Sequence, residues 1–247
     1  MKYLYKLLLP VAALFVLLGL ISTDIAYFSE ERPIAIVKKF KPDVTIQNME
    51  VDKSILLDLL ENKGEKLFSG DTLATHVEGF ALVVFMDASV AKVKPSSLLI
   101  VNGEVGNASK EMATRINLEK GEIFLNVEPQ GSNDFEVATS RSLASVKGTD
   151  FGSRDDGYTW VNEGQVDITA LNSGQTISLF DKMFAQVDPE GNEIESGTLS
   201  DEDLQALSDG YDEIESDLIQ KEIKLRFRDE NGQIREISID IFEDEGN

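Results

Sequence analysis

The segment that most constrains the fold runs from Phe135 to Ile168. It contains three short runs in which alternate positions hold apolar or β-favouring residues: Phe135-Val137-Thr139, Tyr158-Trp160 and Val166-Ile168. Alternation with a period of two residues is typical of half-buried β-strands. We therefore predict short strands that fold back on one another through tight turns.

A turn-rich stretch, SVKGTDFGSRDDG, separates the first two of these runs. Gly148 can adopt backbone conformations that a Cβ atom forbids, and Thr149 and Asp150 can hydrogen-bond to nearby backbone. The VKGTDF sequence therefore predicts a bulge or a sharp bend, after which Phe151 re-enters the core.

The same kind of pattern extends over most of the chain. Strand-like runs separated by turn formers recur from Ile34 to Val187, at intervals typical of sandwiches, barrels and β-solenoids. The intervals are too short for the helices that connect parallel strands. We predict a mainly β domain of stacked, short antiparallel or solenoid-like strands over residues 34–188. Within it, Val51–Asn62 fits either a short helix or a buried strand.

A second unit is predicted after the turn formers of Asp188–Asn192, over residues 189–247. Ser200 and Asp203 resemble a capping box, and apolar residues then recur at helical spacing. This pattern predicts a helix over residues 201–220, with Gly210 as its weakest position. Its apolar stripe is a candidate partner-binding surface, and packing on the chain's own β domain is the simpler interpretation. The stripe comprises Leu204, Leu207, Tyr211, Ile214 and Leu218.

The tail from Ile223 to Ile241 alternates apolar and charged residues on both sides of Asn231-Gly232, which predicts a β-hairpin. A two-residue turn would place the two apolar sets on opposite faces. A three-residue loop, Glu230-Asn231-Gly232, instead pairs Leu225 with Ile237 and Ile223 with Ile239. We predict the three-residue loop.

Residues 1–23 combine Lys2 and Lys6 with an uncharged apolar run, the pattern of a signal peptide or a signal anchor. The run approaches the roughly 20 residues that span a bilayer, and no clean A-x-A cleavage site precedes Asp24. We expect an uncleaved N-terminal membrane helix, a linker over residues 24–33, and the bulk of the chain on the periplasmic or extracytoplasmic side. A cleaved signal peptide, and hence secretion, is the alternative.

The chain is strongly acidic, with 45 Asp and Glu against 23 Lys and Arg and a formal net charge of −22. Such a chain is repelled by nucleic acid and by anionic lipid headgroups, so neither is an expected partner. Acidic turns such as Asp155-Asp156-Gly157 could bind calcium, but none has the spacing of an EF-hand loop. The sequence therefore leaves calcium binding possible and unsupported.

The sequence contains no recognisable catalytic pattern. Cysteine is absent and His76 is the single histidine, which excludes thiol nucleophiles and clustered His/Cys zinc sites. There is no Gly-x-Ser-x-Gly elbow and no glycine-rich phosphate loop. We expect no catalytic residues, no cofactor and no metal site, and thus a protein that is not an enzyme.

The region around Gly148 also carries a family resemblance. The order Ala144-x-Val146-Lys147-Gly148-Thr149-x-Phe151 and then Glu163-Gly164-x-Val166, preceded by a Gly-Asp and an Asp-Ala-Ser segment, resembles the signature of the FecR-type domain family. The resemblance covers about Ile34 to Val187. Lys147 stands where arginine is usual, and Ala88 replaces a glycine, which weakens a turn. The motif residues are Gly70, Asp71, Asp87, Val146, Lys147, Gly148, Thr149, Phe151, Glu163 and Gly164.

The resemblance implies an exported β domain related to cell-surface-signalling regulators, which pass a signal from an outer-membrane receptor to a sigma factor. Members that regulate sigma factors carry a cytoplasmic helical segment before the membrane span, whereas six residues precede the apolar run here. We expect a stand-alone FecR-domain protein without that anti-sigma segment, which binds an envelope or outer-membrane protein. A structural or carbohydrate-binding module of the envelope is the alternative. The oligomeric state is not indicated.

Overall fold

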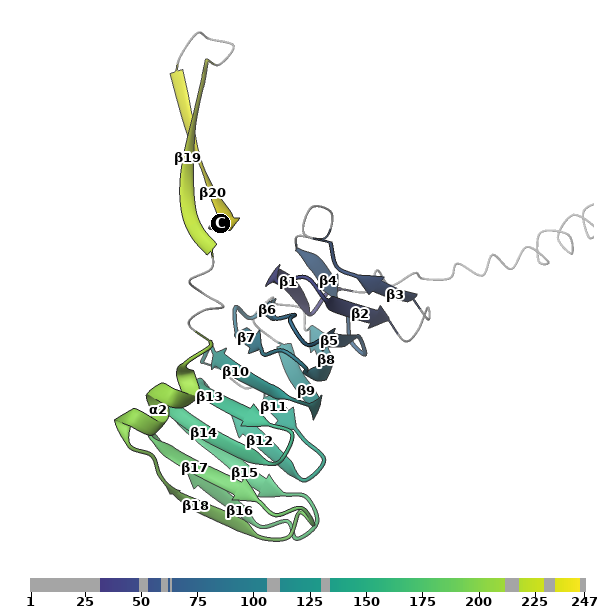
Figure 1. The fold of residues 1–247 in the computed structure, drawn as a ribbon, viewed down its shortest axis with the longest axis vertical. Helices are drawn as coiled ribbons and strands as arrows, with labels where there is room; N and C mark the ends of the chain where they lie inside the picture. Colours follow the sequence, from purple (N-terminus) through teal and green to yellow (C-terminus); the bar gives the residue numbers. More distant parts are fainter. Residues whose placement is uncertain are drawn as a thin grey trace, which may run out of the picture. The chain divides into compact units, whose positions relative to one another are not determined.

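The computed structural model describes residues 32–48, 53–58, 62, 64–105, 112–129, 134–211, 218–228 and 234–244. These residues form two large β-sheets, a separate two-stranded sheet and one helix, α2 (Figure 1). The predicted N-terminal membrane helix lies outside the described residues. Within them, no helix has the length and apolar character needed to cross a membrane.

Sheet A contains nine strands in the order β18-β17-β14-β13-β10-β7-β6-β1-β4. Every neighbouring pair in it is antiparallel. Its strands are β1 (Ala35–Phe40), β4 (Glu65–Leu67), β6 (Ala81–Phe85), β7 (Val90–Val93), β10 (Glu122–Val127), β13 (Thr149–Arg154), β14 (Tyr158–Glu163), β17 (Met183–Val187) and β18 (Ile194–Thr198).

Sheet B also contains nine strands, in the order β16-β15-β12-β11-β9-β8-β5-β2-β3. Its neighbours are antiparallel except β9 and β11, which run parallel. The strands are β2 (Val44–Asn48), β3 (Lys53–Leu56), β5 (Thr72–Thr75), β8 (Leu98–Val105), β9 (Met112–Lys120), β11 (Phe135–Ala138), β12 (Ser142–Val146), β15 (Val166–Ala170) and β16 (Thr176–Leu179).

The chain crosses between the two sheets after every one or two strands. Thus β11 and β12 lie in sheet B, β13 and β14 in sheet A, β15 and β16 in sheet B, and β17 and β18 in sheet A. The sheets therefore grow in step, strand by strand along the chain (Figure 1). This arrangement confirms the predicted fold class, a mainly β domain of stacked short strands.

The main core lies between the two sheets, as the alternation predicts. In β15, Val166, Ile168 and Ala170 are buried while Asp167 and Thr169 are half-buried. Phe85 of sheet A and Phe135 of sheet B meet edge to face, with ring centroids 5.5 Å apart. Alternate residues of each strand thus supply one continuous apolar layer.

A second apolar cluster covers the outer face of sheet A. It comprises Phe80, Leu82, Phe124, Trp160 and Tyr211, with Leu204 and Leu207 of α2 (Asp201–Ser208) packed against it. Because this part of the sheet is buried on both faces, Glu122–Val127 is apolar at consecutive positions rather than alternate ones.

Helix α2 is much shorter than the sequence predicts. The capping box of Ser200 and Asp203 is present, but the helix ends at Ser208 and Gly210 has a φ of +89°. The predicted continuation to residue 220 is wrong, because a backbone with that φ cannot continue a right-handed helix. Ile214 lies outside the described residues, and Leu218 begins strand β19 (Leu218–Arg228).

Two further boundaries follow from the strand pairing. Asp188–Asn192, where the sequence predicts the end of the β domain, lies in the turn between β17 and β18, so sheet A extends to Thr198. The segment Val51–Asn62, for which the sequence fits either a helix or a strand, contains β3.

The tail is a hairpin of β19 and β20 (Ile234–Asp244), and its register confirms the predicted pairing. Leu225 lies opposite Ile237, and Ile223 lies opposite Ile239. The predicted loop itself, Glu230-Asn231-Gly232, lies outside the described residues.

Candidate functional site

The central motif residues build the crossings between the sheets. Lys147 and Gly148 connect β12 of sheet B to β13 of sheet A, and Gly164 lies in the connection from β14 back to β15. Gly148 has a φ of +111°, and a Cβ atom there would lie 2.9 Å from the Cα of Pro129. Gly164 has a φ of +102°, and its Cβ would lie 2.8 Å from Thr149 Oγ1. Both positions require glycine.

Thr149 ties these two crossings together. Its hydroxyl donates to the carbonyl of Gln165 at 2.8 Å and accepts from the Gln165 N–H at 3.2 Å. Val146 and Phe151, on either side of the bend, are both buried in the core. Glu163 is exposed beside a register shift between β13 and β14. The bend and bulge predicted from VKGTDF are confirmed.

The upstream motif residues also hold turns. Gly70 has a φ of +89°, and the Asp71 carboxylate, only 2% exposed, accepts from the Phe68 N–H at 2.8 Å and from Asn48 Nδ2 at 2.7 Å. Asp87 accepts from the N–H and the hydroxyl of Ser89 at 2.9 and 3.0 Å. Ala88, between them, has a φ of +73°.

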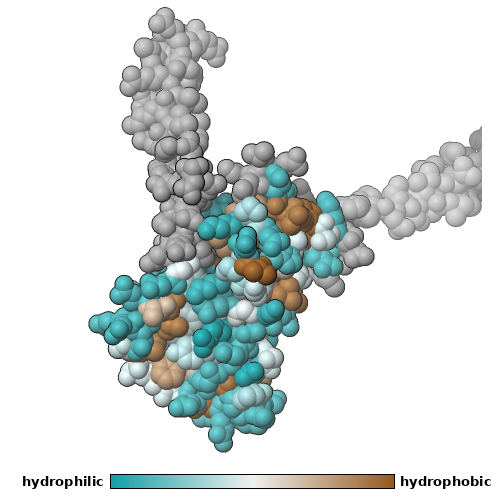
Figure 2. Space-filling view, in the orientation of Figure 1, coloured by the Kyte–Doolittle hydropathy of each residue, from teal (hydrophilic) through white to brown (hydrophobic). Residues whose placement is uncertain are grey.

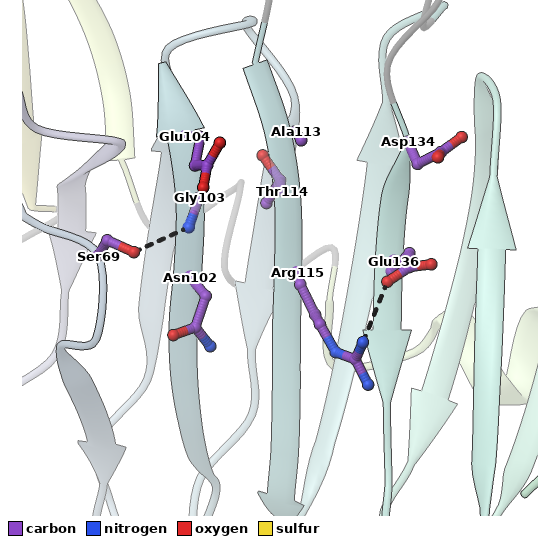
Figure 3. A pocket seen from close by; sticks show the side chains of 9 residues that line it. All are labelled: Ser69, Asn102, Gly103, Glu104, Ala113, Thr114, Arg115, Asp134 and Glu136. Atoms are coloured by element: carbon purple, nitrogen blue, oxygen red, sulfur yellow. Dashed lines mark hydrogen bonds and ion pairs between the residues drawn. The ribbon is translucent and has the colours of Figure 1, made fainter. Parts of the chain in front are cut away.

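Sheet B carries a polar hollow of about 350 Å³ over β8, β9 and β11 (Figure 3). Because β9 and β11 are parallel, Arg115 lies directly opposite Glu136, and the two form an ion pair at 3.4 Å. The Thr114 hydroxyl in the hollow is buried and has no hydrogen-bond partner among the described residues. The lining residues are Ser69, Asn102, Gly103, Glu104, Ala113, Thr114, Arg115, Asp134 and Glu136.

A second hollow of about 280 Å³ adjoins the signature bend, and Asp134 lines both hollows. Lys147 and Gly148 form part of its wall, with Ser145, Val146, Gln165 and Asp167. Lys147 is exposed, whereas Asp167 accepts hydrogen bonds from Gln165 Nε2 at 3.2 Å and from the Ser178 hydroxyl at 2.6 Å. The motif therefore shapes a surface as well as a turn.

The two hollows mix both signs of charge. Glu104, Asp134, Glu136 and Asp167 supply carboxylates, while Arg115 and Lys147 supply cations. Paired charges and amides at a partly open surface can bind polar groups of a protein by hydrogen bonds and ion pairs. Nothing in the sequence pattern singles out Asn102, Arg115 or Glu136, because only the strand pairing brings them together.

The described residues of the candidate partner-binding stripe lie on sheet A and not at the hollows of sheet B. Leu204, Leu207 and Tyr211 pack on the outer face of sheet A. The Tyr211 hydroxyl donates to Glu122 Oε1 at 2.8 Å, and Lys94 Nζ lies 2.7 Å from the same oxygen. Burial and the neighbouring Glu122 raise the pKa of Tyr211 far above its usual value, so the phenol stays protonated and keeps donating. Of the rest of the stripe, Ile214 lies outside the described residues and Leu218 is the first residue of β19.

The acidic turns within the described residues use their carboxylates locally. Asp156 accepts from the Tyr158 N–H, and Asp188 accepts from the N–H groups of Glu193 and Asn192. Those hydrogen bonds, the one from Glu193 first, hold the pKa of Asp188 below its usual value. Across the ranges described, no three His, Asp or Glu side chains gather as a metal ion would need.

The rest of the surface is mostly polar. Figure 2 shows hydrophilic side chains over most of the visible face, interrupted by small, separate apolar patches. His76 is exposed between β5 and β6.

Two sheets built from alternating short strands, with crossings fixed by motif glycines, define a stacked β module with a polar hollowed face. Residues 71–167 match the family model described as FecR protein. This match confirms, for residues 71–167, the resemblance seen in the sequence.

Two crystal structures of candidate anti-sigma factors from Parabacteroides distasonis are similar to part of the chain. One has a TM-score of 0.47 at 18% identity and the other 0.46 at 20% identity. Each similarity covers 56% of this chain, and 65% and 63% of the respective neighbours, so the chain spans slightly less than two thirds of their length. No curated protein matches this chain.

Proposed function

We propose that this chain is a non-enzymatic signalling module of the cell envelope, which binds another protein through the two hollows of sheet B. The match of residues 71–167 to the FecR protein model supports a regulatory role, and the basic and apolar pattern of residues 1–23 supports export or membrane anchoring. A protein partner fits the size and mixed polarity of the surface better than a small molecule does.

One observation carries the proposal. Apart from Ser69, every residue that lines the two hollows lies within the matched residues 71–167. Most motif residues in that segment are occupied in holding turns, so the side chains that can discriminate between partners are those of the hollows. Recognition then resides in Asn102, Arg115, Glu136 and Lys147.

Carbohydrate binding has less support. Sugar rings are usually held against exposed aromatic faces, and no aromatic residue lines either hollow. The aromatic residues Phe124 and Trp160 of sheet A are buried under Tyr211 and α2.

The test is site-specific photocrosslinking in the native host with the full-length chain. A photoreactive residue in place of Asn102 should crosslink to a single envelope protein, identified by mass spectrometry. Arg115→Glu should abolish the adduct, because it adds a fourth carboxylate to Glu104, Asp134 and Glu136.

The exposed Lys66 on β4 provides the matched control, since Lys66→Glu makes the same change of charge away from the hollows. Adducts that persist in Arg115→Glu, or that are lost equally in Lys66→Glu, would contradict the assignment of the site. Retention of the chain on glycan arrays, without a protein adduct, would favour the carbohydrate-binding alternative.

A further inference from the structure

The edge of sheet B at β16 differs from the other sheet edges of the molecule. Edge strands expose unpaired backbone groups, and proteins usually protect them with charged side chains. Three of the four edges of the large sheets have such charges: Lys53 on β3, Glu65 and Lys66 on β4, and Glu195 on β18. Strand β16, Thr176-Ile177-Ser178-Leu179, has none, and also has no proline or glycine.

The hydrogen-bond pattern identifies which backbone groups of β16 are free. The Ala170 N–H donates to the Gln175 carbonyl, so these two residues form a hydrogen-bonded pair of the β15–β16 ladder. Pairs alternate in an antiparallel ladder, so Ile177 and Leu179 bond to β15. The N–H and C=O groups of Thr176 and Ser178 therefore point away from the sheet.

The pairing on the other side of β15 agrees. The Leu171 N–H donates to the Arg141 carbonyl, which assigns the odd-numbered residues of β15 to the ladder with β12. The even-numbered residues of β15 therefore form their backbone hydrogen bonds with β16. Two N–H and two C=O groups of β16 thus form an open ladder ready to accept another strand.

An exposed apolar side chain lies at one end of this edge. Phe180, directly after β16, is 52% exposed. Neither hollow includes it. A strand added along β16 would therefore find backbone partners in its middle and an apolar contact at that end.

The charges near the edge indicate what kind of strand fits. Asp167 lies opposite Ser178 on β15, and the exposed Asp181 follows Phe180. A second copy of the chain would bring these carboxylates together and would also add its own net charge of −22. An extended segment with an uncharged middle and basic ends complements this edge.

We propose that β16 is a docking edge on which an extended segment of a partner protein, uncharged in its middle and basic at its ends, adds as a tenth strand of sheet B. The segment pairs with Thr176 and Ser178, while one of its apolar side chains contacts Phe180. The edge lies outside residues 71–167, so this inference does not depend on the hollows.

The test uses the full-length chain in detergent micelles and two synthetic eight-residue peptides. Both have alternating Thr and Val in the middle, one with Lys at each end and the other with Glu. Amide hydrogen exchange is followed by NMR. The Lys peptide should slow exchange at the free amides of Thr176 and Ser178, leave the already bonded Ile177 and Leu179 amides unchanged, and bind about tenfold more tightly than the Glu peptide.

Ser178→Pro removes one outward N–H at an edge position that tolerates proline, whereas Ser178→Ala keeps that N–H. The proline variant should bind the Lys peptide about tenfold more weakly than the alanine variant, as expected for one lost hydrogen bond. Ser196→Pro makes the same change at the charged β18 edge and should bind like the wild type, as should Arg115→Glu.

Several outcomes would overturn the proposal. One is unchanged exchange at Thr176 and Ser178 with saturating Lys peptide. Another is equal peptide binding by folded Ser178→Pro and Ser178→Ala variants. A third is protection of these amides that requires no peptide and rises with protein concentration, which would identify a second copy as the occupant. If Ser178→Pro does not fold, the alternating exchange pattern in the wild-type chain decides.

Discussion

At the residue scale, Gly148 shows how a motif position can depend on the absence of a Cβ atom. Residues with a side chain rarely adopt its φ of +111°, and the Pro129 backbone fills the space that a Cβ would need. Gly174 has a φ of +72° but no atom within 4 Å of its would-be Cβ. The two glycines thus separate the conformational cost of a side chain from the steric cost.

Gly148→Val should destabilise the chain by about 2–3 kcal/mol, because both costs apply. The matched variant Gly174→Val should lose only about 1–2 kcal/mol, the conformational cost alone. Urea unfolding followed by far-UV circular dichroism measures both. If Gly148→Val unfolds at the same urea concentration as the wild type, the glycine is incidental to the bend.

Ala88 presents the opposite case, a side chain where the turn favours glycine. Its φ of +73° costs an L-residue about 1–2 kcal/mol. Glycine avoids this cost, but it makes the unfolded chain more flexible, which lowers stability by about 0.5–1 kcal/mol. Ala88→Gly should therefore stabilise the chain by about 0.5 kcal/mol. Ala206→Gly, in helix α2, should destabilise it by up to about 1 kcal/mol. A thermal melt in which both changes lower the Tm equally would show that the Asp87–Ser89 turn is not strained.

At the element scale, local rules predict an element well where the sequence contains all of its determinants. The register of β19 and β20 follows from the position of Asn231-Gly232 and from the need to keep the apolar residues on one face. The length of α2 does not follow from the apolar spacing, because Gly210 ends the helix while Tyr211 continues the periodic pattern from a non-helical backbone. Tyr211 is apolar at this position of the pattern because its side chain packs on sheet A.

Tyr211 is also the residue that closes the outer cluster of sheet A. Tyr211→Phe keeps the ring on Phe124 but removes the hydrogen bond to Glu122, and should cost about 1–2 kcal/mol. Tyr211→Ala also uncovers the cluster, so the emission of Trp160, the single tryptophan, should shift to longer wavelength.

The matched control is Tyr158→Phe, in the same cluster, since the structure describes no hydrogen bond for the Tyr158 hydroxyl. Urea unfolding is followed by tryptophan fluorescence and circular dichroism together. Equal effects of the two Tyr-to-Phe changes would show that the bond to Glu122 contributes nothing.

At the scale of the whole molecule, the sequence predicts the class of fold but not the surface. The strand alternation and turn spacing between Ile34 and Val187 are enough for stacked short strands. The hollows and the β16 edge depend on strand order, above all on the parallel pairing of β9 with β11, which no local pattern encodes. Residues such as Arg115 and Glu136, far apart in the chain, become neighbours only through that order.

Net charge is a property of the whole chain, and it leads to the last prediction. With a formal charge of −22 at pH 7, the folded state concentrates repelling carboxylates that the unfolded chain spreads apart. Raising NaCl from about 0.01 M to about 1 M shortens the screening length from about 30 Å to about 3 Å, so the Tm at pH 7 should rise by several degrees. The control is the same salt series near the sequence pI of about 4.3, where the net charge vanishes and the rise should disappear. An equal rise at both pH values would mean that salt acts on hydration of the chain in general and not on repulsion between its carboxylates.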